Sequence, residues 1–162
     1  MGRSALVTGG NRGIGLAIAQ AFVAAGDRVA ITARSGELPE ALVGSDVLVL
    51  AADVTDSASI DAAFDRVEAE LGPVEIAVAN AGITRDTLIL RMSDEDIDAV
   101  IDTNLKAVFR MSRTVIRPMM KQRYGRIINI TSVVGASGNA GQSNYAAAKA
   151  GVAGMTRALA RE

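Results

Sequence analysis

Short apolar runs alternate along this chain with segments of helical periodicity, and that alternation limits the possible folds more than any other feature. Runs of strand length lie at 4–8, 28–32, 47–51, 74–79 and 126–131. Apolar residues at helical spacing follow at 14–25, 57–71, 103–122 and 144–161. Strand and helix units joined by short connections predict an α/β fold, a doubly wound parallel sheet with helices on both faces.

Two segments are less regular. Residues 36–43 are compatible with a short turn or helix, and residues 83–92 with a loop that ends at Ser93, a residue type that often caps helices. The acids at 94–96 then fall in a helix's first turn, where they favour its dipole, so we interpret them as structural. No linker or repeat divides the chain, so residues 1–162 are predicted to form one domain.

The last apolar run carries Ile127, Ile128 and Ile130, an almost continuous apolar series. Such a series is typical of a parallel strand that is buried on both faces. Open sheets of this class bind ligands at the carboxyl ends of their strands, so the loops after the strands are where functional residues are expected.

The composition excludes several classes of site. The chain has no His, Cys or Trp, which rules out Ser-His-Asp triads, thiol nucleophiles, disulfides and the usual zinc ligand sets, and we expect no metal site. Its net charge of -1 argues against nucleic-acid binding. No signal peptide is evident, and the longest apolar stretch, Val47 to Ala52, is far shorter than a membrane span of roughly 20 residues. We expect a cytoplasmic protein.

The turn after the first apolar run reads Thr-Gly-Gly-Asn-Arg-Gly-Ile-Gly over residues 8–15. Glycines let a backbone turn sharply and approach a pyrophosphate, and the helix that follows offers free N–H groups. The spacing differs from G-x-G-x-x-G, and a purely steric turn is the alternative. The position between a strand and a helix favours dinucleotide binding.

The end of the second strand indicates which dinucleotide. NAD-binding sites usually place an acid there for the ribose 2'-hydroxyl, whereas this chain has Thr-Ala-Arg-Ser at 32–35. Arg34, helped by Arg12, can pair bidentately with a 2'-phosphate, unless both are simply solvated surface charges. We therefore expect NADP(H) rather than NAD(H).

Tyr145 and Lys149 are four residues apart in a predicted helix, so their side chains share one face. A free phenol has a pKa of about 10, and a nearby ammonium or an oxidised nicotinamide lowers it. Tyr145 can then act as a general acid for ketone reduction. By itself this spacing more often marks an ordinary pair on a helix surface. The only other tyrosine is Tyr124.

Taken together, these motifs resemble the short-chain dehydrogenase/reductase family over the entire chain. The resemblance rests on the turn at 8–15, on Asn80-Ala81-Gly82 after the fourth strand, and on Ser132 with the Tyr145 and Lys149 pair. It implies a Rossmann fold of strand order 3-2-1-4-5 and an NADP(H)-dependent oxidoreductase.

The resemblance also assigns roles. Tyr145 would donate a proton to the substrate oxygen, Ser132 would hydrogen-bond that oxygen, and Lys149 would lower the tyrosine pKa and bind the nicotinamide ribose. Asn104 would order a water-linked proton relay to Lys149, and Asp53 would hold the adenine. The cofactor contacts that it implies are Gly9, Asn11, Arg12, Gly13, Ile14, Gly15, Arg34, Asp53, Val54, Asn80, Ala81, Gly82, Tyr145 and Lys149.

Residues 80–86, 119–126 and 138–145 resemble the branch that reduces 3-oxoacyl thioesters on acyl carrier protein in bacterial fatty-acid biosynthesis, and residues 7–20 its mycobacterial members. That implies an NADPH-dependent 3-oxoacyl reductase and a homotetramer. The basic group of Arg117, Lys121, Arg123 and Arg126 can face the acidic carrier, or form only a solvated helix end. Alternatives are a reductase of acetoacetyl-CoA, a small ketone or a sugar, and an inactive cofactor-binding fragment.

Family members continue beyond the point where this chain ends, with two more strands, a Pro-Gly loop and a segment that covers the substrate. We therefore expect a domain that is incomplete at its C-terminus and lacks those strands. In such a domain the strand at 126–131 would form an exposed apolar edge.

Overall fold

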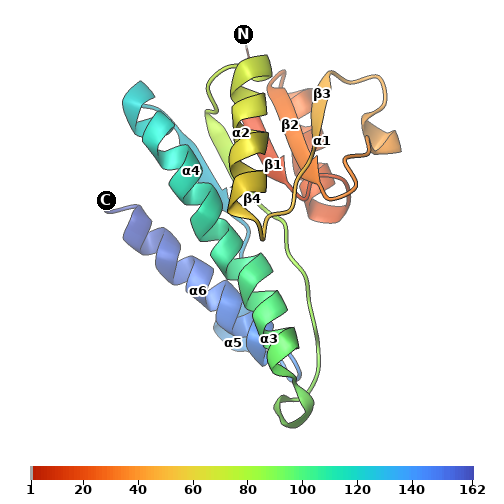
Figure 1. Cartoon of the computed structure of the whole chain (residues 1–162), viewed down its shortest axis with the longest axis vertical. Helices are drawn as coiled ribbons and strands as arrows, with labels where there is room; N and C mark the ends of the chain where they lie inside the picture. The colour runs from red at the N-terminus through yellow and green to blue at the C-terminus, as the bar shows by residue number, and fades with distance from the viewer. Residues whose placement is uncertain (1) are drawn as a thin grey trace.

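Five parallel strands form one sheet in the order β3-β2-β1-β4-β5 in the computed structural model, which describes residues 2–162 (Figure 1). The strands are β1 Ser4–Thr8, β2 Arg28–Ala33, β3 Val47–Ala51, β4 Ile76–Ala79 and β5 Arg126–Asn129. In the central register Val7 of β1 lies opposite Ile31 of β2 and Val78 of β4. The predicted strand order is confirmed.

Helices connect the strands and cover both faces of the sheet. They are α1 Gly13–Ala24, α2 Ser57–Leu71, α3 Asp94–Ile101, α4 Ala107–Gln122, α5 Val134–Ser137 and α6 Ser143–Leu159. A π turn at Asp102–Lys106 joins α3 to α4, and single 3-10 turns lie at Glu40–Leu42 and Ile89–Arg91. None of the helices within residues 2–162 has the length and apolar character needed to cross a membrane.

Successive residues of the central strands point to opposite faces, which divides the core into two layers. Val7 and Ile31 pack with Ala19 of α1 on one face. Leu6 packs with Phe64 of α2 and Met111 of α4 on the other face, which α2 and α4 cross in Figure 1. Both layers leave the carboxyl edge of the sheet open, and the loops after β1, β4 and β5 meet there.

Two helix starts have side-chain caps, one of them at Ser93 as the sequence predicted and one at Asp56 that was not predicted. Ser93 accepts a hydrogen bond from the Asp96 backbone N–H at 3.1 Å and begins α3. Asp56 accepts one from Ala58 at 3.0 Å and begins α2. Both side chains satisfy an N–H group that the helix itself leaves without a partner.

The helix predicted from residue 103 begins earlier and is not regular. The backbone is helical from Asp94 to Gln122, with the π turn at Asp102–Lys106 inserted inside it. A π turn adds a residue to one helical turn and is often found at functional sites. Asn104 lies in the middle of this one.

The expectation that the last strand is buried on both faces is wrong. Ile128 is 42% exposed, and the strand ends at Asn129 rather than Thr131. The reason is its place in the sheet, because β5 pairs with β4 only and forms the outer strand among residues 2–162. The expectation of an exposed apolar edge agrees with this arrangement. Between β5 and α6 lies α5, a one-turn helix that the sequence did not indicate.

Candidate active site

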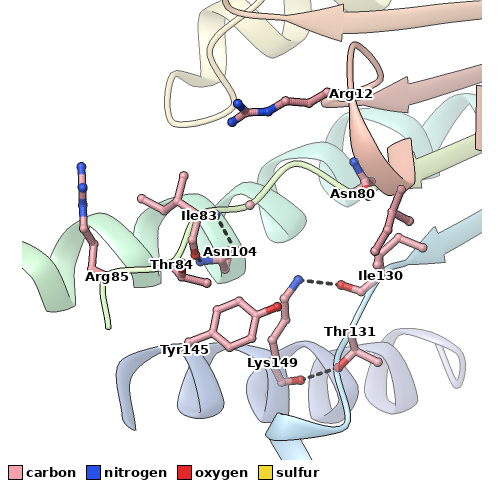
Figure 2. A pocket seen from close by; sticks show the side chains of 12 residues that line it. Arg12, Asn80, Ile83, Thr84, Arg85, Asn104, Ile130, Thr131, Tyr145 and Lys149 are labelled. Atoms are coloured by element: carbon pink, nitrogen blue, oxygen red, sulfur yellow. Dashed lines mark hydrogen bonds between the residues drawn. The ribbon is translucent and has the colours of Figure 1, made fainter. Parts of the chain in front are cut away.

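A cavity of about 470 Å³ lies at the carboxyl edge of the sheet, where the loops after β1, β4 and β5 face α6 (Figure 2). Seven of the residues predicted to bind cofactor or to take part in catalysis line it, namely Arg12, Ile14, Asn80, Gly82, Asn104, Tyr145 and Lys149. The fold therefore brings together, in one hollow, residues that are up to 137 positions apart in the chain (Arg12 to Lys149). No cluster of three or more Asp or Glu carboxylates that could hold a metal ion occurs among residues 2–162.

Tyr145 and Lys149 reach into this cavity from the first two turns of α6 (Figure 2). The Lys149 Nζ atom lies 5.7 Å from the centre of the Tyr145 ring. Its ammonium donates a hydrogen bond to the Ile130 carbonyl oxygen at 2.7 Å, and the residue is only 5% exposed. Burial lowers the pKa of Lys149 below its usual 10.5, because the charged form is poorly solvated there.

The burial of Lys149 predicts a pH-dependent stability. Between the lowered folded-state pKa and the usual 10.5, the unfolded chain binds more protons than the folded chain, so the free energy of unfolding rises with pH. Lys149→Met lacks this dependence. The wild-type free energy of unfolding minus that of Lys149→Met should therefore increase between pH 7 and about pH 10.5, as measured by urea denaturation. A constant difference would contradict the lowered pKa.

Asn104 is fully buried and holds the loop after β4. Its Oδ1 accepts from the Ile83 N–H at 3.1 Å, while its Nδ2 donates to the carbonyls of Ile83 at 2.7 Å and Val100 at 3.0 Å. Val100 lies four residues before Asn104, in the last turn of α3, so this bond joins the π turn to the helix that precedes it. The side chain thus lies at the cavity wall with its amide engaged by backbone groups, and its role in a proton relay stays a prediction.

Ser132 lies just after β5, next to the cavity. Its Oγ accepts a hydrogen bond from the Val134 N–H at 3.2 Å, at the start of α5. The neighbouring Thr131 lines the cavity, and its hydroxyl donates to the Lys149 carbonyl oxygen at 3.0 Å. The Ser132 hydroxyl keeps its own proton available for donation, so its predicted contact with a substrate oxygen is chemically possible.

The glycine turn after β1 is packed against the loop after β4. A Cβ atom on Gly15 would lie 2.2 Å from the Gly9 carbonyl oxygen and 2.4 Å from the Asn80 amide nitrogen. The Asn80 amide itself donates to the carbonyls of Thr8 at 3.0 Å and Gly9 at 3.1 Å. Glycine at 15 is therefore a steric requirement of the contact between the two loops.

The same turn fits the pyrophosphate of a dinucleotide. Gly9 and Gly13 have φ angles of +64° and +54°, which glycine adopts without strain. Arg12 at the N-cap position of α1 makes no side-chain cap, and no acid lies in the first turn, so the N–H groups there are free for an anion. Arg12 itself extends along the cavity in Figure 2.

Arg34, Asp53 and Val54 lie outside this cavity, at the ends of β2 and β3. Asp53 accepts hydrogen bonds from the backbone and hydroxyl of Thr55 at 2.8 and 2.7 Å, and these bonds, with a smaller effect of the Arg34 charge, lower its pKa. Arg34 is exposed, and Val54 borders a small hollow beside Thr8. The structure places these residues along the same carboxyl edge as the glycine turn.

Several residues at the site were missed by the sequence argument. Ile83, Thr84, Arg85, Ile130 and Thr131 line the cavity, although no role at the site was predicted for them. Thr131 could have been found from its place at the end of the last predicted strand, next to Ser132. The other four residues lie in loop segments that form part of the cavity wall, and the position of these segments depends on the rest of the fold.

Comparison with known proteins gives a consistent result. The sequence pattern of the family described as short chain dehydrogenase matches residues 3–162. The 3-oxoacyl-[acyl-carrier-protein] reductase FabG of Escherichia coli is 52% identical, covering 99% of this chain and 67% of its own length. The enzymes of the same description named MabA, from Mycobacterium avium and Mycobacterium tuberculosis, are 50% and 49% identical, with 61% and 63% of their lengths covered.

The chain thus spans about two thirds of the length of these curated relatives. The match to the family begins at residue 3, just before β1, and continues through α6 to residue 162. Because that match includes the glycine turn and the helix of Tyr145 and Lys149, the chain belongs to the short chain dehydrogenase family of oxidoreductases.

Proposed function

We propose that this chain is the catalytic and cofactor-binding part of an NADPH-dependent reductase that converts a 3-oxoacyl thioester to the 3-hydroxyacyl thioester in fatty-acid biosynthesis. One observation carries the proposal: the paired Tyr145 and Lys149 face a cavity that adjoins a glycine turn suited to a dinucleotide. The substrate class is supported by relatives of about 50% identity that are named for this reaction.

The proposed reaction adds a hydride to the C3 carbonyl carbon and a proton to its oxygen. A bound nicotinamide supplies the hydride, which is chemistry that amino-acid side chains cannot provide. The Tyr145 hydroxyl gives the proton to the carbonyl oxygen, and the Ser132 hydroxyl donates a hydrogen bond to that oxygen. Lys149 contributes a buried positive charge beside the phenol, which favours the phenolate left after proton transfer.

A substrate comparison tests this function. NADPH oxidation should be measured with an acetoacetyl group carried on acyl carrier protein, on coenzyme A, and as a free ketone. We expect the highest kcat/KM with the carrier protein. A free ketone reduced as well as either thioester would favour a small-ketone reductase, and NADPH binding without any turnover would favour a cofactor-binding fragment.

The preference for NADP(H) rests on Arg34. A charge-assisted hydrogen bond to a 2'-phosphate contributes about 1.5–3 kcal/mol, so Arg34→Ala should weaken NADPH binding about tenfold or more and leave NADH binding unchanged. Dissociation constants from fluorescence titration test this. Arg66→Ala, which removes an exposed arginine paired with Glu70 on α2, is the control. Tighter binding of NADH than of NADPH by the wild-type protein would contradict the proposal.

The basic group that is predicted to face the acidic carrier lies far from the cavity of its own chain. Arg117, Lys121, Arg123 and Arg126 are exposed at the end of α4 and the start of β5, and within residues 2–162 they form no ion pair. The Arg126 N–H bonds the Glu75 carbonyl at the amino edge of the sheet, and the 16 residues of α4 span about 24 Å. We propose that a carrier bound there serves the cavity of a neighbouring copy in a homo-oligomer.

Charge reversal at Arg123 tests this docking. Arg123→Glu should lower kcat/KM for the carrier-bound substrate about tenfold, because an acidic partner is then repelled, and should spare a small free ketone. Raising the salt concentration should reduce the difference between the variant and the wild type. Equal losses with both substrates would count against docking at this group.

A further inference from the structure

We infer that Asn144 is a positioning residue for Tyr145, holding the start of α6 against the loop after β4; the inference deepens the proposed reductase function and rests on it. Asn144 immediately precedes Tyr145 and is 4% exposed, although its side chain is polar. A buried amide is costly unless its hydrogen bonds are made, so its partners indicate what it is for.

All the partners of the Asn144 amide are backbone groups around the catalytic tyrosine. Its Oδ1 accepts from the Tyr145 N–H at 2.7 Å, an N–H in the first turn of α6 that has no helical partner. Its Nδ2 donates to the Arg85 carbonyl oxygen at 3.1 Å and, more weakly, to the Asp96 carbonyl oxygen at 3.5 Å. One side chain therefore joins the backbone of Tyr145 to the cavity loop and to α3.

Only an amide suits this set of partners. The site offers one donor, the Tyr145 N–H, and two acceptors, the carbonyls of Arg85 and Asp96. A carboxylate would accept from Tyr145 but would face two carbonyl oxygens without a proton to share. A leucine, which branches at the same carbon but has no polar atoms, would leave the buried groups unpaired.

The two catalytic side chains of α6 are anchored separately. Near Lys149, the helix is held by the bond from its ammonium to Ile130 and by the bond from the Thr131 hydroxyl to its carbonyl. Near Tyr145, Asn144 is the attachment within the helix itself, and just before the helix the Gln142 amide donates to Asp86 and the Thr87 N–H donates to the Gly141 carbonyl. In Figure 2, Tyr145 and Lys149 extend from α6 toward the cavity that the Arg85 segment also lines. Loss of Asn144 should release the tyrosine end while the lysine end stays in place.

This separation predicts a specific kinetic pattern for Asn144→Leu. A displacement of about 1 Å of a reacting group can cost about 100-fold in rate, so kcat for thioester reduction should fall between about tenfold and 100-fold. The dissociation constant for NADPH should change less than about twofold, because Lys149 and the glycine turn keep their contacts. Exchange of the Tyr145 amide hydrogen, followed by NMR, should be at least tenfold faster, with the Lys149 amide unchanged.

Two further variants separate positioning from general destabilisation. Asn144→Asp keeps the oxygen that accepts from the Tyr145 N–H but lacks the amide N–H donors. It should therefore retain protection of the Tyr145 amide hydrogen and still lower kcat. This variant also tests the inference if Asn144→Leu does not fold. The matched control is Asn139→Leu, since Asn139 is an exposed asparagine in the segment between α5 and α6, and within residues 2–162 its side-chain amide donates only to Gln142, at 3.0 Å. It should leave kcat, NADPH affinity and Tyr145 exchange unchanged.

The inference is overturned if Asn144→Leu keeps wild-type kcat, or if kcat and NADPH affinity fall together in proportion to lost stability. It is also overturned if the Tyr145 amide exchanges at the wild-type rate. If the wild-type protein reduces no thioester, the proposed function fails, and the exchange and NADPH measurements still decide whether Asn144 holds Tyr145.

Discussion

Tyr145→Phe should lower kcat for thioester reduction by at least about 100-fold while leaving the affinity for NADPH nearly unchanged. Tyr145 carries the only phenol among the residues that line the cavity. General acid catalysis typically raises a reaction rate by a factor of roughly 10²–10⁴. Phenylalanine preserves the ring, whose centre lies 5.7 Å from the Lys149 Nζ atom, so packing and binding should persist. Steady-state kinetics and fluorescence titration of NADPH measure the two quantities.

Tyr124→Phe is the natural control because it removes the only other phenol. Tyr124 is 40% exposed at the link between α4 and β5, where the Arg126 guanidinium lies 5.2 Å from its ring centre. We expect its kcat to equal that of the wild type. A Tyr145→Phe enzyme that turned over normally would remove the basis of the proposed mechanism.

Gly15→Ala should have the second large effect, on cofactor binding and on stability. A helix normally gains about 1 kcal/mol when glycine becomes alanine, but here the new Cβ would lie 2.2 Å from the Gly9 carbonyl oxygen. That contact cannot be relieved by a side-chain rotation, and overpacking of this kind costs about 1–3 kcal/mol. The displaced turn should also bind NADPH at least about tenfold more weakly.

Gly154→Ala provides a control of opposite sign. Gly154 lies inside α6, and a Cβ atom there would meet no atom within 4 Å. We therefore expect the free energy of unfolding to rise by about 0.5–1 kcal/mol, with NADPH affinity unchanged. Thermal or urea denaturation of both variants tests the contrast. A Gly15→Ala protein that is as stable as the wild type and binds NADPH as tightly would show that the glycine turn does not hold the pyrophosphate.

Most of the secondary structure could be predicted because its causes are local. The helix Ser57–Leu71 was predicted with its observed bounds, from apolar spacing and the glycine that follows it. The cap at Ser93 was predicted from a side chain and acids within four positions. The π turn around Asn104 was not predicted, and the side chain at its centre bonds to Ile83, 21 residues earlier in the chain, a partner that no local pattern marks.

The candidate site likewise combines features that local sequence predicts with features that depend on distant segments. The pairing of Tyr145 with Lys149 follows from helix geometry alone, and the glycine turn from its place after β1. The attachment of Asn144 to Arg85 joins a side chain to a carbonyl group 59 residues away. Backbone carbonyls are the same in every residue, so no pattern in the sequence marks such a partner.

The sequence by itself determined the alternation of strands and helices, the glycine turn and the spacing of Tyr145 and Lys149, because periodicity, capping and helix geometry act over a few residues. Only the tertiary structure decided that β5 is an outer strand with Ile128 exposed, and that Asn104 and Asn144 tie the cavity loops together. Those features depend on which distant segments the sheet brings side by side, and the packing of the whole chain sets that arrangement.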